Sequence, residues 1–259
     1  MGLFDKKYCD ICGDKIGLLG NRKLEDGNLC KNCAKKLSPW FSERRHSTLA
    51  EIKEQLAYRA ENQKKVDGFK TTRSFGRGTL VCLDEDGKQF LVAKTDDIST
   101  ENPDVLDYSQ VTGCDLDIEE NRTEETHTDK EGKSVSYNPP RYRYSYDFYM
   151  VIRVNHPYFD EMRFKLNTSS VEIEKTLPRN APAHVVGALN STAANQDYRE
   201  YEQMGKEINE ALTAVRETAR EDSAAANAPK VAVTCPLCGA TTIPDEFGRC
   251  EYCGGSVKG

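Results

Sequence analysis

The sequence predicts an α+β protein with a small four-cysteine module at each end, a central antiparallel β domain, and a long helix that closes that domain. Three observations support this class. Eight of the ten cysteines fall into pairs near the two ends of the chain. Hydrophobic residues recur at the period of a strand between residues 66 and about 166, and at the period of a helix on either side. A chain of 259 residues is long enough for one ordinary domain with small appendages.

The cysteine spacing predicts a zinc ribbon at each end of the chain. The pairs form two quartets: Cys9, Cys12, Cys30 and Cys33, then Cys235, Cys238, Cys250 and Cys253. Two residues between cysteines allow a tight turn to aim both sulfurs at one point, and two such turns complete a tetrahedron around zinc. A glycine just after a pair supplies the positive φ that this turn requires. We therefore expect these eight residues to bind two structural zinc ions, with no other cofactor.

Thiolates bound to metal account for these cysteines better than disulfides do. The first residues contain no secretory signal, and no apolar run approaches the length of a membrane span, so we expect a reducing, cytoplasmic location. A thioredoxin-type redox role needs a βαβ pattern around one pair, and neither end of the chain has one. The remaining two cysteines, Cys82 and Cys114, lie in strand-like runs and are expected to be core residues.

Residues 1–65 are expected to form the first zinc ribbon and a helix. A turn at Asp26-Gly27 lies between two short strand-like runs. Thr48 and Glu51 have the spacing of a capping box, and an apolar stripe follows, which together predict a helix from about Thr48 to Lys65. Trp40 is the only tryptophan, and we expect it to pack between the ribbon and this helix.

Residues 66–222 are expected to form the central β domain. A hairpin is predicted for residues 79–93 and a charged loop for residues 121–137. The strongest strand pattern covers residues 142–154, where aromatic and aliphatic side chains occupy one face and arginines the other. So long a strand should bend or bulge midway and serve two parts of a sheet. Aromatic and arginine residues could also stack on nucleic acid bases, but a shared face with Met, Ile and Val favours a core.

The remaining segments connect the domain to the second ribbon. Residues 177–195 predict a linker or loop, and residues 196–222 a helix with one apolar seam. This seam could form a coiled-coil homo-oligomer, but its short length favours packing on the chain's own sheet. Residues 223–231 predict an Ala-rich hinge, and residues 232–259 the C-terminal zinc ribbon.

Residues that could carry catalysis are not apparent. The sequence has neither a glycine-rich phosphate loop nor a His-Glu-x-x-His motif. The four histidines fall in loops or turns: His46, His127, His156 and His184. An all-sulfur zinc site is closed, because four thiolates leave no position for an activated water. We expect no enzymatic activity and no catalytic residue.

The N-terminal segment resembles a bacterial zinc-ribbon family of unassigned function. The residues that carry this resemblance extend from Cys9-x-x-Cys12-Gly13 to Cys30-x-x-Cys33, and it covers about residues 8–60. The resemblance implies a downstream β module similar to pleckstrin-homology-like domains. The second quartet, with Cys-Pro-x-Cys-Gly and Cys-x-x-Cys-Gly, resembles the generic zinc ribbon that ends many bacterial proteins. Neither resemblance implies catalytic residues.

These observations together predict a zinc-binding adaptor whose ribbons and β domain bind protein or peptide partners. The first alternative is nucleic-acid binding through the ribbons, which the net charge of +5 in residues 1–65 favours. The acidic remainder opposes it, with −7 in residues 66–180 and −4 in residues 181–259. The second alternative is association with a membrane surface through the β domain. That role needs a basic surface, so the charge of this domain argues against it.

Overall fold

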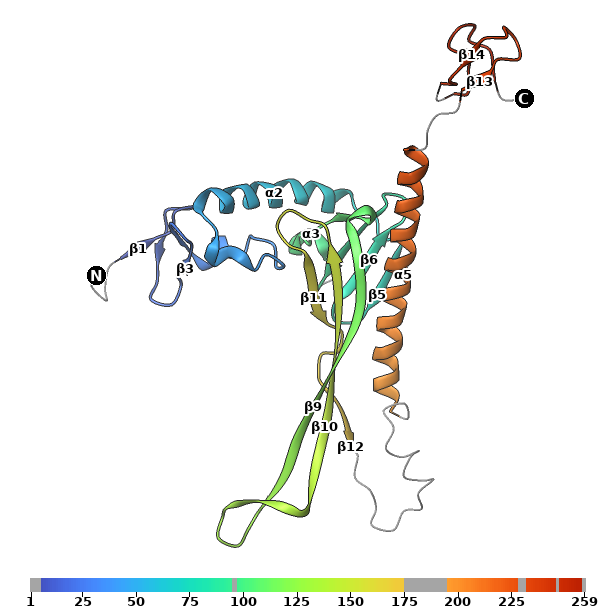
Figure 1. Cartoon of the computed structure of the whole chain (residues 1–259). Helices are drawn as coiled ribbons and strands as arrows, with labels where there is room; N and C mark the ends of the chain where they lie inside the picture. The colour runs from blue at the N-terminus through green and yellow to red at the C-terminus, as the bar shows by residue number, and fades with distance from the viewer. Residues whose placement is uncertain (1–5, 95–96, 175–194, 228–231, 246, 258–259) are drawn as a thin grey trace, which may run out of the picture. The chain divides into compact units, whose positions relative to one another are not determined.

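The computed structural model describes residues 6–94, 97–174, 195–227, 232–245 and 247–257. The chain divides into two compact units, residues 1–216 and residues 217–259, and the boundary lies inside the long helix α5 (Gln196–Ala226) (Figure 1). Antiparallel sheets, four-cysteine groups near both ends and this helix agree with the predicted α+β class. The boundary expected after residue 65 lies inside the first unit.

The N-terminal module consists of two short hairpins and two short helical segments. Their bounds are β1 (Lys7–Tyr8), β2 (Lys15–Ile16), β3 (Arg22–Lys23), β4 (Asn28–Leu29), α1 (Lys31–Ala34) and η1 (Glu43–His46). The turn predicted at Asp26-Gly27 joins β3 to β4. Leu24, Leu29 and Ile52 are fully buried beside the cysteines. So small an apolar core needs bound metal to hold a fold.

Helix α2 (Leu49–Gly68) confirms the helix predicted from the capping box. The Thr48 hydroxyl accepts from the Glu51 N–H, and the Glu51 carboxylate accepts from the Thr48 N–H. The Asp26 carboxylate accepts from the Leu49 N–H at 2.7 Å, so the β3–β4 turn also caps this helix. The buried side of α2 carries polar as well as apolar residues, because the helix packs on a loop of the β domain.

The first sheet of the β domain has the strand order β5-β6-β7-β8. The strands are β5 (Arg73–Gly76), β6 (Leu80–Asp84), β7 (Gln89–Ala93) and β8 (Leu106–Asp107), with α3 (Ile98–Glu101) between β7 and β8. The predicted hairpin is β6–β7. Its turn is closed by the Asp84 carboxylate, which accepts from the Gly87 N–H at 2.8 Å.

The second sheet is built around one long strand. Its strands are β9 (Val111–Thr128, after η2 at Tyr108–Gln110), β10 (Ser134–Val154), β11 (Glu161–Lys165) and β12 (Val171–Glu174). β9 pairs with one edge of β10, while β11 and β12 pair with different lengths of the other edge. The long strand therefore serves two parts of the sheet, as predicted. The register shifts of β10 lie near its ends and not midway.

The prediction of a charged loop at residues 121–137 was wrong. This segment forms the outer part of the β9–β10 hairpin, which extends beyond the rest of the sheet in Figure 1. Both faces of the outer hairpin are exposed to solvent or half-buried, so charged residues on either face cost little. The many charged residues in this segment therefore did not show whether it forms a loop or a pair of strands. Four residues of β10, 137–140, have no partner in the β9 register.

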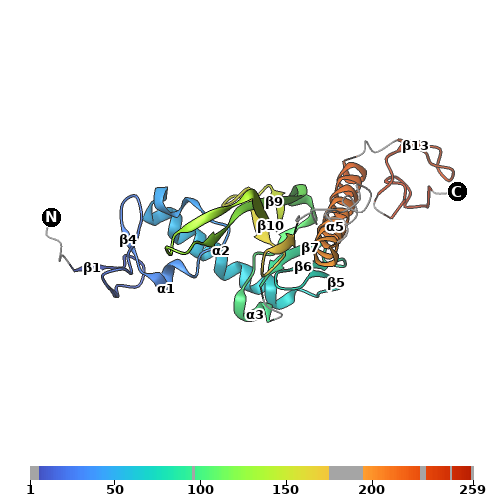
Figure 2. The ribbon, with the colours of Figure 1, turned by 90° about the horizontal axis from the view of Figure 1, so that it is seen from below.

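Helix α5 packs on the second sheet, as its seam predicted. The Tyr198 ring makes edge contacts with Tyr146 and Phe148 at 5.1 and 5.0 Å, and Gly205 lies against Leu116. Helix α5 also lies near β5, the edge strand of the first sheet, with which it lines a hollow (Figure 2). The expected linker at residues 177–195 lies almost wholly outside the described residues.

Two further expectations need correction. Residues 223–226, expected as part of a hinge, form the last turn of α5, because alanine is the best helix former. Residues 228–231 lie outside the described residues. Trp40 does not pack between the ribbon and α2: its ring lies 6.3 Å from that of Phe164 on β11, so it contacts the β domain.

The second unit contains the last Cys-x-x-Cys pairs. Its strands β13 (Val233–Thr234) and β14 (Thr241–Thr242) form one small hairpin, and a bridge joins Arg249 to Ser256. None of the helices in the described ranges is long and apolar enough to span a membrane.

Candidate metal centres

The structure brings the sulfurs of each predicted quartet together. Within each quartet, all four Sγ atoms lie within 4.8 Å of one another. Three sulfur pairs have closer separations: Cys12–Cys30 at 3.7 Å, Cys235–Cys253 at 3.6 Å and Cys238–Cys250 at 3.7 Å. Among the residues that the structure describes, these are the two groups of three or more side chains that could hold a metal ion.

The Cys9–Cys12 pair is held by a tight backbone turn. The Gly13 N–H donates to the Cys9 carbonyl at 2.8 Å, and the Cys9 N–H donates to the Asp14 carbonyl at 2.9 Å. Gly13 has φ +77°, a conformation that residues with a Cβ rarely adopt. The glycine therefore allows the chain to fold back beneath the two sulfurs.

The Cys30–Cys33 pair differs from a ribbon turn. Cys30 is the N-cap of α1, and its sulfur accepts from the Cys33 N–H at 3.3 Å. Cys33 is followed by Ala34 rather than glycine, so the chain continues into a helical turn. The first site therefore combines a glycine turn with the start of a helix. The Cys9 sulfur joins the two halves by accepting from the Cys30 N–H at 3.3 Å.

The C-terminal site has a glycine turn at each pair. The Gly239 N–H donates to the Cys235 carbonyl at 2.9 Å, and the Gly254 N–H donates to the Cys250 carbonyl at 2.8 Å. Both glycines have positive φ, at +73° and +69°. The two turns repeat the hydrogen bonding of the Cys9–Cys12 turn, so three of the four pairs share one backbone conformation.

The sulfur separations fit a tetrahedral metal ion. Zinc–sulfur bonds of about 2.3 Å in a tetrahedron place the sulfurs about 3.8 Å apart, whereas a disulfide would bring them to about 2.05 Å. The separations of 3.6 and 3.7 Å match the first geometry. Four thiolates also complete the coordination sphere of zinc, which makes both sites closed.

The pKa of one thiol in the first quartet, Cys9, and of two in the second, Cys235 and Cys250, is lowered by nearby hydrogen-bond donors. Burial raises the pKa of Cys9, but backbone N–H groups that include those of Cys12 and Cys30 outweigh it and lower the pKa to about 6. Burial also raises the pKa of Cys250, and the N–H groups of Cys253 and Tyr252 again lower it to about 6. In contrast, the pKa of Cys33 is raised, chiefly by burial. Ionising all four thiols of a site therefore requires the charge of the metal.

Residues outside the cysteine pattern position the first site. The Asp10 N–H donates to the Asn28 carbonyl at 2.9 Å, and the Asp10 carboxylate accepts from the Asn28 N–H at 2.6 Å, which joins the glycine turn to β4. Asp26 then links the β3–β4 turn to α2. Sequence reasoning missed both roles, because an isolated aspartate gives no signal of a partner 18 or 23 residues away.

The two remaining cysteines lie apart from both quartets. Cys82 and Cys114 are buried core residues, as predicted. Burial raises the pKa of Cys114 to about 12, so this thiol stays protonated at neutral pH. A protonated thiol is a poor metal ligand and a poor nucleophile.

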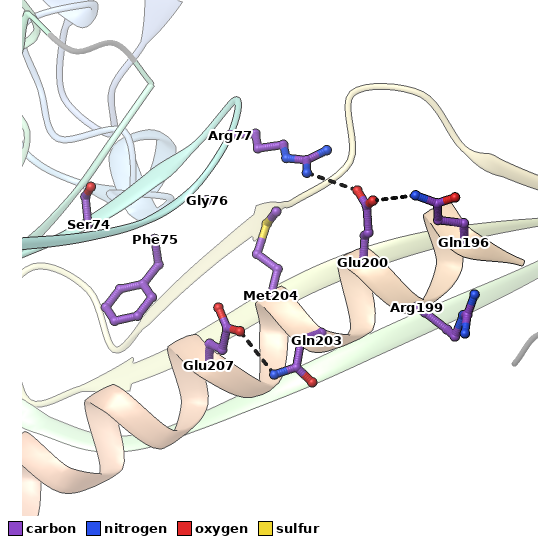
Figure 3. A pocket seen from close by; sticks show the side chains of 10 residues that line it. All are labelled: Ser74, Phe75, Gly76, Arg77, Gln196, Arg199, Glu200, Gln203, Met204 and Glu207. Carbon is purple, nitrogen blue, oxygen red and sulfur yellow. Dashed lines mark hydrogen bonds and ion pairs between the residues drawn. The ribbon is translucent and has the colours of Figure 1, made fainter.

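A hollow of about 660 Å³ lies between β5 and the first half of α5 (Figure 3). Phe75 and Met204 face the space between the two elements, and Arg77 forms an ion pair with Glu200 across it at 3.0 Å. In the described ranges β5 pairs with β6 alone, so its other edge carries backbone groups without a strand partner. A hollow beside a sheet edge is a surface on which an extended peptide can add a strand.

The C-terminal unit exposes large apolar side chains. Four of them are 47% to 74% exposed: Leu237, Ile243, Phe247 and Tyr252. Leu237 and Tyr252 occupy the same position in their respective turns, one residue before the second cysteine. Several large exposed apolar residues on so small a unit are typical of an interaction surface.

The fold and these sites define an α+β protein with two four-cysteine groups, each of which could hold a metal ion. Residues 7–55 match the family model of a domain of unknown function, DUF4428, which includes the whole first quartet and the start of α2. This agrees with the resemblance found from the sequence over residues 8–60. No curated protein and no solved structure matches the chain.

Proposed function

We propose that this chain is a non-catalytic zinc-binding adaptor, in which zinc shapes two small modules and the β domain binds protein or peptide partners. The observation that carries the proposal is the tetrahedral spacing of the sulfurs in both quartets. Zinc is the metal that four thiolates in this geometry bind most commonly in structural sites. A reducing compartment such as the cytoplasm would keep these thiols available.

The absence of catalysis is part of this proposal. A catalytic zinc keeps one coordination position for water or substrate, and a four-thiolate site has none to offer. His46, His127 and His156 lie apart from both quartets. The proposal therefore assigns both metals to structure, with no catalytic residue.

The arrangement of the β domain supports a pleckstrin-homology-like module. A four-stranded antiparallel sheet comes first in the chain, a second antiparallel sheet follows, and a helix packs on the second sheet afterwards. The hollow between β5 and α5 then supplies a candidate groove for an extended peptide.

The exposed apolar residues of the second unit support a separate docking surface. A zinc site can display such residues at little cost, because metal ligation and not apolar burial holds the module together. Leu237 and Tyr252 lie on the two glycine turns, whose geometry the cysteines fix.

Two measurements test the adaptor. Elemental analysis of the purified chain should find two zinc ions per molecule, and zinc-free folded protein would contradict the proposal. Capture from native extract should then compare the intact chain with two variants, Cys235→Ser/Cys238→Ser and Leu237→Ser/Tyr252→Ser. The second variant keeps all eight ligands, so loss of a partner in both variants assigns the apolar surface. An unchanged set of partners would refute that assignment.

Nucleic-acid binding through the basic N-terminal segment is the competing function. Phosphate contacts release counterions, so binding would weaken steeply as salt concentration rises. Filter binding of the intact chain to duplex DNA and to single-stranded RNA over a range of salt concentrations separates the two functions. The adaptor proposal expects no retention above the background of an acidic control protein.

A further inference from the structure

A second hollow, of about 690 Å³, lies beside the connection from the N-terminal module to α2. One wall comes from residues 39–43, and the other from the β10–β11 turn and the start of β11. Six of its lining side chains matter here: Trp40, Glu43, His156, Tyr158, Asp160 and Glu161. All of these belong to the first unit and are distant in sequence from the cysteines of the second.

The hollow has preformed aromatic walls. The His156 ring stacks on Phe159 with centroids 4.1 Å apart, and the Tyr158 ring lies 5.2 Å from Tyr58 of α2. Trp40 is held on the opposite side by Phe164, at 6.3 Å. Rings fixed by neighbouring rings lose little entropy when a ligand stacks on them, which favours binding.

The rim of the hollow carries unbalanced negative charge. Glu43, Asp160 and Glu161 are exposed, and none of them forms an ion pair in the described part of the chain. The one cation of the lining, Arg163, already has two carboxylate partners, Asp117 at 2.7 Å and Glu119 at 2.6 Å. Those two carboxylates neutralise the charge of Arg163 on the outer face of the sheet, so Arg163 does not neutralise the acids of the rim.

A contact on the same surface indicates which ligand a combination of aromatic rings and carboxylates accepts. The Arg163 guanidinium lies 4.3 Å from the centre of the Tyr149 ring while both of its Nη atoms bind carboxylates. A planar cation can stack on an aromatic ring and donate to carboxylates at the same time, whereas a neutral side chain can do neither as well. The hollow presents both elements, aromatic rings and carboxylates, without a cation of its own to occupy them.

We propose that this hollow binds the guanidinium of an arginine side chain supplied by a protein partner. The proposal rests on the adaptor function for the origin of the ligand, and on the lining residues for its chemistry. Trp40 and Tyr158 offer ring faces, and Asp160 and Glu161 offer adjacent carboxylates that can accept from the fork of N–H donors. Because the rim is exposed, binding weakens as ionic strength rises.

The sole tryptophan makes the test direct, because Trp40 lines the hollow. Full-length zinc-loaded protein is titrated with the blocked peptide Gly-Gly-Arg-Gly-Gly while tryptophan fluorescence is followed. We expect a saturable change with a dissociation constant in the millimolar range, reduced by added salt. The matching peptides with Gln or Lys in place of Arg separate charge from shape. No saturation with the Arg peptide, or equal binding of either matching peptide, would overturn the assignment.

Variants locate the binding and separate this proposal from the adaptor proposal. Asp160→Asn/Glu161→Gln should raise the dissociation constant of the Arg peptide at least tenfold. Glu131→Gln, which changes an exposed acid between β9 and β10, should leave that constant unchanged. Equal binding of the Arg peptide to the unaltered chain and to both variants would refute the site. Arg binding that persists in Leu237→Ser/Tyr252→Ser would support the hollow even if no partner is captured. Partners captured unchanged by Asp160→Asn/Glu161→Gln would refute the hollow as a docking site and leave the adaptor intact.

Discussion

The Arg59 guanidinium donates to the Asp104 carboxylate at 2.7 Å, and both side chains are buried. Arg59 belongs to α2, and Asp104 to the loop that leads into β8. The same carboxylate accepts from the Ser38 hydroxyl at 2.7 Å and from the Tyr58 hydroxyl at 3.0 Å. One buried acid therefore gathers three donors from the N-terminal region and fixes that region to the β domain.

Removing this acid should destabilise the first unit strongly. Asp104→Ala leaves a buried guanidinium without its partner, which typically costs about 3–5 kcal/mol. We expect a fall of this size in the free energy of unfolding, measured with urea and the fluorescence of Trp40. Glu61→Ala is the matched control, because it breaks the exposed Lys64–Glu61 pair, worth at most about 1 kcal/mol. Equal effects of the two variants would contradict the role given to Asp104.

Packing of α5 on the second sheet depends on a glycine. A Cβ on Gly205 would lie 2.5 Å from Leu116 Cδ1 and 3.0 Å from its Cγ, so the whole Leu116 side chain would have to move. Gly205→Ala gains about 1 kcal/mol of helix propensity but incurs about 1–3 kcal/mol of overpacking. We expect a net loss of about 1 kcal/mol by urea unfolding.

Gly68 at the end of α2 provides the comparison for this substitution. Nothing lies within 4 Å of a Cβ placed there. Gly68→Ala should therefore leave stability unchanged or raise it by at most about 1 kcal/mol. A stabilising effect of Gly205→Ala would show that α5 does not pack tightly against Leu116.

The sequence predicted the cysteine groupings because metal ligation imposes short, fixed spacings on the chain. A Cys-x-x-Cys pair must turn within two residues to aim both sulfurs at one ion, and that requirement is visible locally. The backbone conformation of each turn was harder to predict from the sequence than the grouping of the cysteines. Gly13, Gly239 and Gly254 mark three backbone turns, whereas the residue after Cys33 is the helix former Ala34, and that difference was overlooked.

Other features depend on partners far away in the sequence. Arg59 and Asn62, on the buried side of α2, have partners more than 40 residues later, so no local pattern predicted these contacts. The outer β9–β10 hairpin was mistaken for a loop because its charges lie on two solvated faces and give no apolar alternation. Long-range pairing of β10 decided the structure there.

Single-ligand variants should reveal two independent metal sites. We expect Cys12→Ser and Cys238→Ser each to reduce the zinc content measured by elemental analysis from two ions per chain to one, because three thiolates and a hydroxyl bind zinc poorly. Cys114→Ala should retain both ions, since that residue lies outside the quartets. Loss of both ions from either serine variant would instead indicate that the two sites depend on each other.

The outer hairpin should be dispensable for stability. Replacing residues 125–141 with Asn-Gly joins Glu124 to Tyr142, two residues already opposite each other, through a favoured two-residue turn. We expect the free energy of unfolding to change by less than about 1 kcal/mol, because the removed segment buries little apolar surface. Phe148→Ala, at a fully buried position of the same strand, should cost about 3–5 kcal/mol. A comparable loss on shortening would show that the outer hairpin supports the core.

His156 should make stability depend on pH near neutrality. Burial lowers its pKa below the usual 6.5, the Asp104 charge opposes this shift, and the Lys65 charge adds to it. The folded chain therefore holds the ring neutral at pH values where the unfolded chain already binds a proton, so stability is complete above about pH 6.5 and falls as the pH drops toward the folded pKa.

His156→Phe keeps an aromatic ring against Phe159 but cannot titrate. Urea unfolding at intervals between about pH 7.5 and 5.5 should give a shallower decline for this variant than for the unaltered chain. Parallel curves for the unaltered chain and His156→Phe would mean that folding leaves the pKa of this ring unchanged. The ring would then gain a positive charge below about pH 6.5, which would oppose binding of a guanidinium in the hollow beside it.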